Sequence, residues 1–234
     1  MAKVELKAAD GFRFGAYVAL PREQAQGGVV VIQEIFGVNR HIRAVADGYA
    51  AAGYAVIAPQ IFDRVERDVE LGYSAQADFD KGLRLAFHDL KQEQVLLDLQ
   101  ASVDYIARYG RVGVVGYCFG GLLTWLAACE LKDVAMASAY YGGGTAREVH
   151  RRPHCPVMMH FGERDKHIPM ADVETIRRAH PAVQIFVYDA DHGFNCDERG
   201  SYDETSASIA RDRTLNFFEK HMKFDPDSTV VMPR

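Results

Sequence analysis

The sequence predicts an α/β fold with a mostly parallel central sheet, helices on both of its faces and an antiparallel hairpin at the N-terminus. Continuously apolar, β-branched runs, typical of strands buried on both faces, alternate with stretches of helical periodicity. The N-terminal residues instead alternate polar and apolar side chains, as a half-exposed hairpin does. The chain contains no internal repeat or linker, so we expect one domain over residues 1–234.

The N-terminal half begins with a hairpin over residues 3–8 and 12–20, for which Asp10-Gly11 is the turn signal. The next expected elements are a buried strand at 29–32, a helix over about 40–52, a buried strand at 54–59 and an amphipathic helix over 94–108. Residues 62–91 are charged and only patchily helical. We expect them to form a surface excursion that helps to enclose a substrate pocket, although a solvated helical face also explains its individual charges.

The C-terminal half continues the alternation of strands and helices. Strands are expected at 111–116, 134–142, 156–162 and 183–188, and helices directly after residue 118, near 170–179 and over about 204–221, before a tail at about 222–234. In a parallel sheet the ligand site lies beyond the carboxyl ends of the strands. Glu34, Cys118, Asp165 and His192 each follow a predicted strand. We therefore expect them to converge at one edge of the sheet.

The overall composition excludes several classes of protein. Hydrophobic residues at 48% and charged residues at 25% are ordinary for a soluble globular chain. A formal net charge of −5, with both signs mixed, argues against nucleic acid or a membrane surface as partner and leaves a small-molecule substrate. The chain has no apolar run of about 20 residues and no apolar signal core at its start, so we expect a cytoplasmic protein. The oligomeric state stays open, with a monomer slightly favoured.

The cysteines and histidines give no sign of a disulfide framework or a metal site. The four cysteines form no Cys-x-x-Cys pair, so free thiols are expected. Cys129 and Cys155 are expected to be packing residues, whereas Cys196 lies in a loop that should reach the active site. The histidines lack ligand spacing and no phosphate-binding loop is present, so neither metal nor cofactor is expected.

Residues 116–121, with the sequence GYCFGG, carry the strongest motif. Gly-x-Cys-x-Gly between a strand and a helix is the nucleophile elbow of α/β-hydrolases, with cysteine in place of the usual serine. The nucleophile needs positive φ there, and Gly116 and Gly120 avoid collisions with the turning chain, while Gly121 lets the helix approach the sheet. The helix N-terminus favours a thiolate on Cys118. The alternative is an inert cysteine buried in a glycine-rich corner.

A nucleophilic cysteine needs a base and a group that orients the base. His192 follows the last predicted strand and Asp165 follows the strand before it, and the order nucleophile, Asp, His is that of α/β-hydrolases. Asp189 and Asp191 compete with Asp165, but Asp191 directly precedes the histidine and should point away from its ring. The alternative for His192 is an ordinary loop histidine.

Backbone amides complete the predicted site. The amides of Phe119, after the nucleophile, and Ile35, after the first central strand, are placed to stabilise an oxyanion. A thiolate, with a reference pKa of about 8.5, leaves a tetrahedral intermediate more easily than an alkoxide does. We therefore expect substrates with good leaving groups, such as enol lactones, aryl esters or thioesters, and hydrolysis through a thioester acyl-enzyme.

Four motifs together resemble the dienelactone hydrolase (carboxymethylenebutenolidase) family. They are QEIFGVN at 33–39, GYCFGG at 116–121, GERD at 162–165 and DHGF at 191–194, in the family's order. The resemblance covers nearly the whole chain and implies a carboxylic ester hydrolase of α/β-hydrolase fold with a triad of Cys118, His192 and Asp165. It also implies that Glu34 holds the resting thiol until substrate displaces it.

The chain departs from the family pattern in the loop after the histidine. Where well-known members have a serine directly after the histidine and an arginine four residues after it, this chain has Gly193 and Cys196. In those members the two residues help to hold a substrate carboxylate. Arg199 of the same loop, or Arg64 or Arg84 of the excursion, could supply the positive charge instead. The candidate substrate-contacting residues are Phe36, Tyr117, Cys196 and Arg199.

Two other functions remain open from the sequence. One is a general carboxylesterase or thioesterase built on the same triad. The other is a binding or redox protein in which Cys118 is a sensor thiol and nothing is hydrolysed. A sensor has no need of Asp165 and His192 at strand ends.

Overall fold

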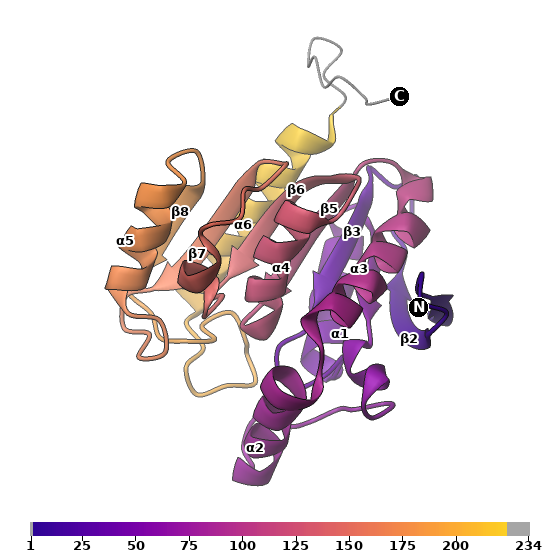
Figure 1. The fold of residues 1–234 in the computed structure, drawn as a ribbon. Coiled ribbons are helices and arrows are strands. Elements are labelled where there is room, and N and C mark those ends of the chain that lie inside the picture. The colour runs from indigo at the N-terminus through magenta and orange to yellow at the C-terminus, as the bar shows by residue number, and fades with distance from the viewer. Residues whose placement is uncertain (1, 224–234) are drawn as a thin grey trace.

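The computed structural model describes residues 2–223 and confirms the predicted α/β class (Figure 1). One eight-stranded sheet has the strand order β1-β2-β4-β3-β5-β6-β7-β8. The strands are β1 Ala2–Lys7, β2 Arg13–Ala19, β3 Gly28–Ile32, β4 Ala55–Pro59, β5 Val112–Tyr117, β6 Val134–Tyr140, β7 Val157–Gly162 and β8 Gln184–Tyr188. β2 pairs antiparallel with β1 and β4, and the other neighbours are parallel.

Helices cover both faces of this sheet. They are α1 Arg40–Ala51, α2 Gln76–Arg84, α3 Gln92–Ile106, α4 Phe119–Glu130, α5 Met170–Ala179 and α6 Glu204–Met222. In Figure 1, α3 and α4 lie in front of the sheet and α6 lies behind it. The rings of Tyr49 and Phe218, 6.1 Å apart, join α1 to α6. Among residues 2–223, none of the helices has the length and apolar character needed to cross a bilayer.

Local signals in the sequence set the helix ends. Asn39 caps α1, accepting a hydrogen bond from the Ile42 amide at 3.2 Å, and Asp203 caps α6 through the Ser206 amide at 2.7 Å. The last helix, predicted over about 204–221, corresponds to α6, whose last residue, the buried Met222, stands at the approximate start of the predicted tail. The rest of that predicted tail, from residue 224, lies outside the described residues.

The excursion at 62–91 is more ordered than its sequence suggested. It contains the turn η1 (Ile61–Arg64), helix α2 and a turn of π-helix, η2 (Leu85–Asp89). The Leu71 amide donates to the Phe36 carbonyl at 2.9 Å, so the segment packs on the loop that follows β3.

The four candidate site residues follow strands that end at one edge of the sheet. β3, β4, β5 and β7 are buried along their whole length, as expected of strands covered on both faces. Glu34, Cys118, Asp165 and His192 follow β3, β5, β7 and β8. Since these strands run parallel, their carboxyl ends share one edge of the sheet, and the four residues lie there together.

Two glycine-to-alanine variants test the close packing of α4 on this edge. A Cβ on Gly120 would lie 2.4 Å from the Ile32 carbonyl oxygen, so we expect Gly120→Ala to lower the free energy of unfolding by about 1–3 kcal/mol. The matched control is Gly48→Ala in α1, whose Cβ meets nothing closer than the Arg211 side chain at 3.8 Å. It should gain about 0.5–1 kcal/mol of stability. Urea unfolding measures both, and equal effects would contradict the packing argument.

Candidate active site

Cys118 lies at the tip of a strained turn between β5 and α4. Its backbone has φ 55° and ψ −114°, as predicted for an elbow. The Cys118 amide donates to the Tyr140 carbonyl at 3.0 Å, which fixes the turn to the neighbouring strand. A Cβ on Gly116 would lie 2.1 Å from the Gly120 carbonyl oxygen, and one on Gly121 would lie 2.5 Å from the Tyr140 oxygen. Glycine is required at these positions because backbone approaches backbone there.

The side chains of Cys118, His192 and Asp165 form a hydrogen-bonded chain. His192 Nε2 lies 3.1 Å from Cys118 Sγ, and His192 Nδ1 lies 2.7 Å from Asp165 Oδ2. The other carboxylate oxygen of Asp165 accepts from the amides of His167 at 2.8 Å and Ile168 at 3.2 Å. These amides fix the carboxylate, which in turn orients the imidazole toward the sulfur.

Asp189 and Asp191, the alternatives to Asp165, contact groups other than the His192 ring. Asp191 Oδ1 accepts from the His192 amide at 2.7 Å, so it supports the loop backbone and leaves the ring to Asp165. Asp189 is exposed and pairs with Arg164 at 3.2 Å. Of the three candidates, Asp165 is the one whose carboxylate contacts the imidazole.

The electrostatics favour a charged imidazole. Burial by itself would lower the pKa of His192, but the adjacent Cys118 sulfur and the Asp165 carboxylate outweigh burial and raise this pKa to about 10. The ring therefore holds its proton at neutral pH, which suits an imidazolium beside a thiolate.

Glu34 is fully buried beside this chain and has two partners. One carboxylate oxygen lies 3.3 Å from Arg199 Nη1, and the other accepts the hydroxyl proton of Tyr73 at 2.8 Å. Burial and the nearby Glu34 charge raise the pKa of Tyr73 far above its usual value, so the phenol remains a neutral donor. Within residues 2–223, no hydrogen bond joins Glu34 to Cys118, whose sulfur contacts His192 instead.

Arg199 reaches the site because residue 193 is glycine. A Cβ on Gly193 would lie 2.6 Å from Arg199 Nη1, and Gly193 also has φ +79°. The guanidinium therefore occupies the space that a side chain at position 193 would fill. It also lies 5.8 Å from the centre of the Phe36 ring. The loop after the histidine thus brings a cation to the site from position 199.

The other two candidate arginines lie elsewhere. Arg64 has a buried side chain that pairs with Asp98 and Asp10, both at 2.7 Å, so it is neither at the site nor a surface residue. Burial raises the pKa of Asp98 to about 6, although Arg64 acts against that rise. Arg84 is exposed and lies 3.7 Å from Asp89. Of the three arginines proposed from the sequence, only Arg199 lines the cavity that contains Cys118.

The backbone amides of Ile35 and Phe119 are free to bind a ligand. Neither has a hydrogen-bond partner among the residues that the structure describes. Helix α2 packs closely on the Ile35 peptide, since a Cβ on Gly82 would lie 2.3 Å from the Ile35 carbonyl oxygen. This contact fixes the direction of the peptide beside the sulfur.

A cavity of about 400 Å³ opens above Cys118 and His192. Its walls are largely apolar and are formed by Phe36, Phe79, Leu83, Phe87, Phe119 and Leu122. Three of these come from the 62–91 excursion, which therefore encloses the pocket as predicted. Arg199, Arg147 and His167 supply polar groups.

Two predicted substrate contacts lie outside this cavity. Tyr117 is buried beneath the elbow, where its hydroxyl lies 3.3 Å from that of Tyr49, because its side chain points to the α1 and α6 face. Cys196 is fully buried behind Glu34. Phe36 and Arg199 do line the cavity.

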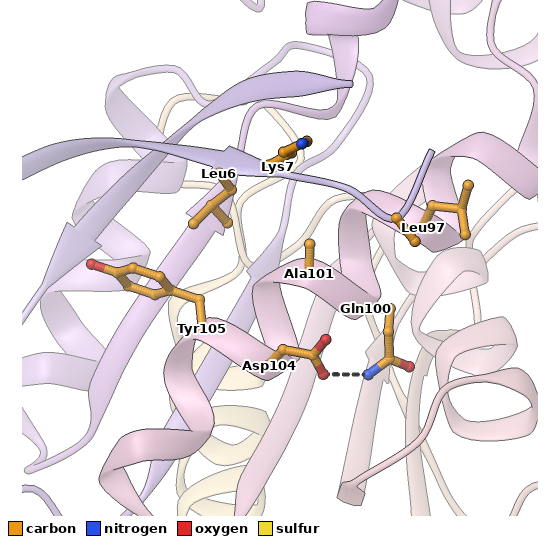
Figure 2. A pocket seen from close by; sticks show the side chains of 8 residues that line it. Leu6, Lys7, Leu97, Gln100, Ala101, Asp104 and Tyr105 are labelled. Atoms are coloured by element: carbon orange, nitrogen blue, oxygen red, sulfur yellow. Dashed lines mark hydrogen bonds between the residues drawn. The ribbon is translucent and has the colours of Figure 1, made fainter. Parts of the chain in front are cut away.

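A second depression, between β1 and α3, offers no comparable chemistry (Figure 2). Leu6, Leu97 and Tyr105 line it, and Gln100 donates to Asp104 at 2.8 Å within it. These side chains include neither a nucleophile nor a histidine, so the cavity above Cys118 is the candidate active site.

The family is decided by a comparison of the whole chain. The sequence model described as "Dienelactone hydrolase family" matches residues 14–222. The chain belongs to this family. A carboxymethylenebutenolidase of Cupriavidus pinatubonensis is 31% identical over 223 residues, which cover 91% of this chain and 94% of that relative.

Other members of the dienelactone hydrolase family agree with this assignment. A provisionally named carboxymethylenebutenolidase of Synechocystis is 35% identical over 215 residues, which cover 83% of this chain and 86% of that protein. The crystal structure of a provisionally named dienelactone hydrolase from Klebsiella pneumoniae is 31% identical, with a TM-score of 0.80 over 93% of this chain and 98% of that one. The fold is that of the α/β-hydrolases, and the chain is a hydrolase of this family.

Two tyrosines at the site were not predicted. Tyr73, from the excursion, binds Glu34, and the sequence around it carried no motif. Tyr141 has φ 37°, and its ring centre lies 5.2 Å from that of His192. Its buried hydroxyl has no hydrogen-bond partner among the described residues. The only signal for Tyr141 was its place at the end of a strand followed by three glycines.

The ion pair of Glu34 and Arg199 can be tested by a double-mutant cycle. Arg199→Met should lower the free energy of unfolding by about 3 kcal/mol at pH 7, because it leaves a buried carboxylate without its cation. Adding Glu34→Gln should restore most of that loss, since the remaining pair is neutral. Urea unfolding of both single variants and the double variant gives the coupling energy. Additive effects would show that the pair contributes nothing.

Proposed function

We propose that this protein hydrolyses activated carboxylic esters, including enol lactones, through a thioester acyl-enzyme on Cys118. The observation that carries the proposal is the 3.1 Å contact of Cys118 Sγ with His192 Nε2, backed by Asp165 and opening on an apolar cavity. This geometry suits a nucleophile, its base and the group that orients the base. His192 and Asp165 have no evident purpose in a sensor thiol.

In the first half of the reaction, the Cys118 thiolate attacks the carbonyl carbon of the ester. The free amides of Ile35 and Phe119 donate to the oxygen that becomes negative. As the intermediate collapses, the carbon–oxygen bond to the leaving group breaks and the imidazolium of His192 gives that oxygen its Nε2 proton. The products are a thioester on Cys118 and an alcohol or enol.

In the second half, neutral His192 takes a proton from water, and the resulting hydroxide attacks the thioester. Collapse of this second intermediate breaks the carbon–sulfur bond and releases the carboxylic acid. The thiolate and the imidazolium are thereby restored. Asp165 holds the ring in one orientation through both halves and stabilises its charged form.

The choice of sulfur limits the substrate. A thiolate, with a reference pKa of about 8.5, is a better leaving group than an ordinary alkoxide, so attack on a plain alkyl ester tends to reverse. An enolate, a phenolate or a second thiolate leaves the tetrahedral intermediate easily enough to compete with the Cys118 thiolate. The relatives' carboxymethylenebutenolidase names point to an enol lactone that carries a carboxylate. The aromatic and aliphatic walls suit an apolar or conjugated acyl group, and Arg199 and Arg147 bring positive charge to the same cavity.

We also propose that Glu34 controls the protonation state of the thiol. Family resemblance assigns it to hold the sulfur at rest, and here it binds Arg199 and Tyr73 while the sulfur contacts His192. This arrangement corresponds to the state in which Glu34 has been displaced and the thiolate is ready to attack. Arg199 and Tyr73 provide the place to which Glu34 moves.

Turnover of a substrate panel tests the mechanism. Wild type should hydrolyse an enol lactone, an aryl ester and an acyl thioester much faster than a plain alkyl ester. Cys118→Ala should lower kcat by about 10³-fold or more, because the covalent path is lost. Cys155→Ala, which changes a cysteine away from the cavity, is the matched control. Mass spectrometry should detect the acyl group on wild type and not on Cys118→Ala.

Each result of the panel has a distinct meaning. Equal rates for wild type and Cys118→Ala would overturn the mechanism. A preference for thioesters or simple aryl esters over the lactone would favour the general esterase or thioesterase. No hydrolysis of any panel member would favour the sensor hypothesis.

The pH dependence tests the role of His192. Since its pKa is raised to about 10, the imidazolium needed by the leaving group is present below that pH and lost above it. The kcat/KM profile for an aryl ester should therefore fall on its basic side near pH 10. Asp165→Asn removes a carboxylate that raises this pKa, so the fall should move to lower pH, with a loss of about 10²–10⁴ in kcat.

The exposed carboxylate of Asp189 supplies the control for this profile. Asp189→Asn removes a charge that contacts Arg164 rather than the imidazole, so its profile should match wild type. An Asp165→Asn profile that also matches wild type would be inconsistent with the assigned role of Asp165.

A further inference from the structure

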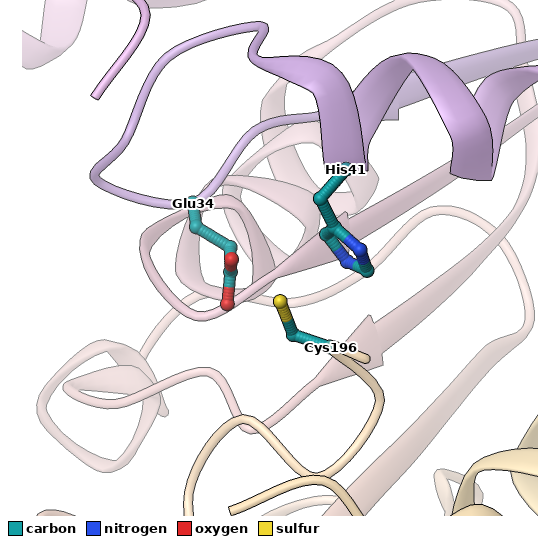
Figure 3. Close-up of side chains that lie close together, drawn as sticks. All are labelled: Glu34, His41 and Cys196. Carbon is teal, nitrogen blue, oxygen red and sulfur yellow. The ribbon is translucent and has the colours of Figure 1, made fainter. Parts of the chain in front are cut away.

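Three potential metal ligands meet in the interior next to the candidate active site (Figure 3). They are Glu34 from the loop after β3, His41 from the first turn of α1 and Cys196 from the loop before α6. All three are buried, and one ligand atom from each lies within 4.8 Å of those of the other two. Figure 3 shows the side chains pointing toward a common centre.

The imidazole of His41 has the orientation that is typical of a metal-binding histidine. Its Nδ1 lies 3.0 Å from the carboxylate of Asp197, which is 70% exposed at the surface. With the Nδ1 proton on that hydrogen bond, Nε2 carries a lone pair directed inward. This atom is buried and has no hydrogen-bond partner among the residues described by the structure. Metal-binding histidines are commonly oriented by a carboxylate on the second nitrogen in this way.

The donor set matches zinc better than calcium or magnesium. One thiol, one imidazole and one carboxylate are the donors that Zn²⁺ takes in proteins, whereas the hard cations prefer oxygen alone. Tetrahedral bonds of about 2.0–2.3 Å separate the ligand atoms by about 3.3–3.8 Å. The ligand atoms lie within 4.8 Å of one another, so binding an ion requires them to move closer together. A thiolate and a carboxylate together match the charge of the ion, and Arg199 remains as a cation beside Glu34.

We propose that Glu34, His41 and Cys196 form an inhibitory Zn²⁺ site. On binding, the S–H bond of Cys196 breaks, its proton passes to solvent, and sulfur, His41 Nε2 and one Glu34 oxygen bond the ion. The fourth position is left to water.

The inhibition, unlike the binding, rests on the proposed function. A Glu34 carboxylate bonded to zinc cannot move to or from the Cys118 sulfur. The ion also restrains the loop that carries Arg199, whose amide donates to the Cys196 carbonyl at 3.0 Å. Zinc therefore fixes both members of the Glu34–Arg199 pair without contacting Cys118.

A cavity other than the one above Cys118 gives access to His41. A separate cavity of about 410 Å³ is lined by His41, Asp197, Tyr49 and Tyr202. This cavity shares no lining residue with the cavity above Cys118. Zinc can thus reach His41 without crossing the substrate cavity, so inhibition should lower kcat more than it raises KM.

Cobalt titration of the Cys118→Ala protein tests the binding directly. Co²⁺ bound to a thiolate gives a near-ultraviolet charge-transfer band, and we expect one ion per chain, with the band retained in Cys118→Ala. Cys196→Ser should abolish the band, and His41→Gln should weaken binding at least about tenfold. Cys155→Ser is the control and should bind as wild type does.

Each outcome of the titration decides the proposal. A band that is lost in Cys118→Ala and kept in Cys196→Ser would place the metal on the catalytic sulfur and overturn the site. No band in any protein would do the same. If His41→Gln does not fold, Asp197→Asn provides a second test. It removes the surface carboxylate that orients the His41 ring through Nδ1, and it should weaken binding about tenfold.

Zinc inhibition is then measured on an aryl ester, with each variant compared with its own metal-free rate. Wild type should lose activity with Zn²⁺ and regain it with a chelator, and His41→Gln should need at least about tenfold more zinc. Equal sensitivity of the two proteins would overturn the inhibitory role. Failure of the proposed hydrolysis would leave the cobalt result unchanged, so the two proposals fail separately.

Discussion

The turn of backbone at Cys118 is the constraint on which the rest of the site depends. A non-glycine residue at φ 55° is unfavourable by about 1–3 kcal/mol, and it persists only where its surroundings enforce it. Here the Tyr140 carbonyl holds the Cys118 amide, and the first turn of α4 lies against the end of β3. The sulfur is thereby fixed at the sheet edge. Loops after β7 and β8, farther along the same edge, bring Asp165 and His192 to it.

The sequence predicted those parts of the fold and site whose causes are local. Buried strands and the elbow glycines each depend on a few neighbouring residues, and the convergence of Cys118, Asp165 and His192 followed because parallel strands end together. The sequence could not predict helix α2, the position of Tyr73 or the Glu34–Arg199 pair, since each depends on contacts between residues that are distant in sequence. Tyr117 was misplaced because adjacency to a nucleophile in sequence does not decide which face of the sheet a side chain takes.

Gly193 and Arg199 are linked, because the missing side chain at position 193 leaves room for the guanidinium. The absence of a side chain at position 193 creates the space that the Arg199 guanidinium fills. A cation is therefore still present in the loop after the histidine, but it reaches the site from a different position and binds Glu34. Cys196 then becomes an interior residue, packed behind Glu34 and close to His41.

Charge balance at the sheet edge links Glu34 to the protonation of the sulfur. Under the proposed mechanism, Glu34 with Arg199 and a Cys118 thiolate with protonated His192 form two neutral pairs. Moving ionised Glu34 to an ionised sulfur would bring two anions into contact at a buried position and leave Arg199 without its partner. Glu34 can therefore approach the sulfur only when a proton lies between them. Under the proposed mechanism, displacement of Glu34 and formation of the thiolate are consequently a single event, driven by whatever draws the carboxylate to Arg199 and Tyr73.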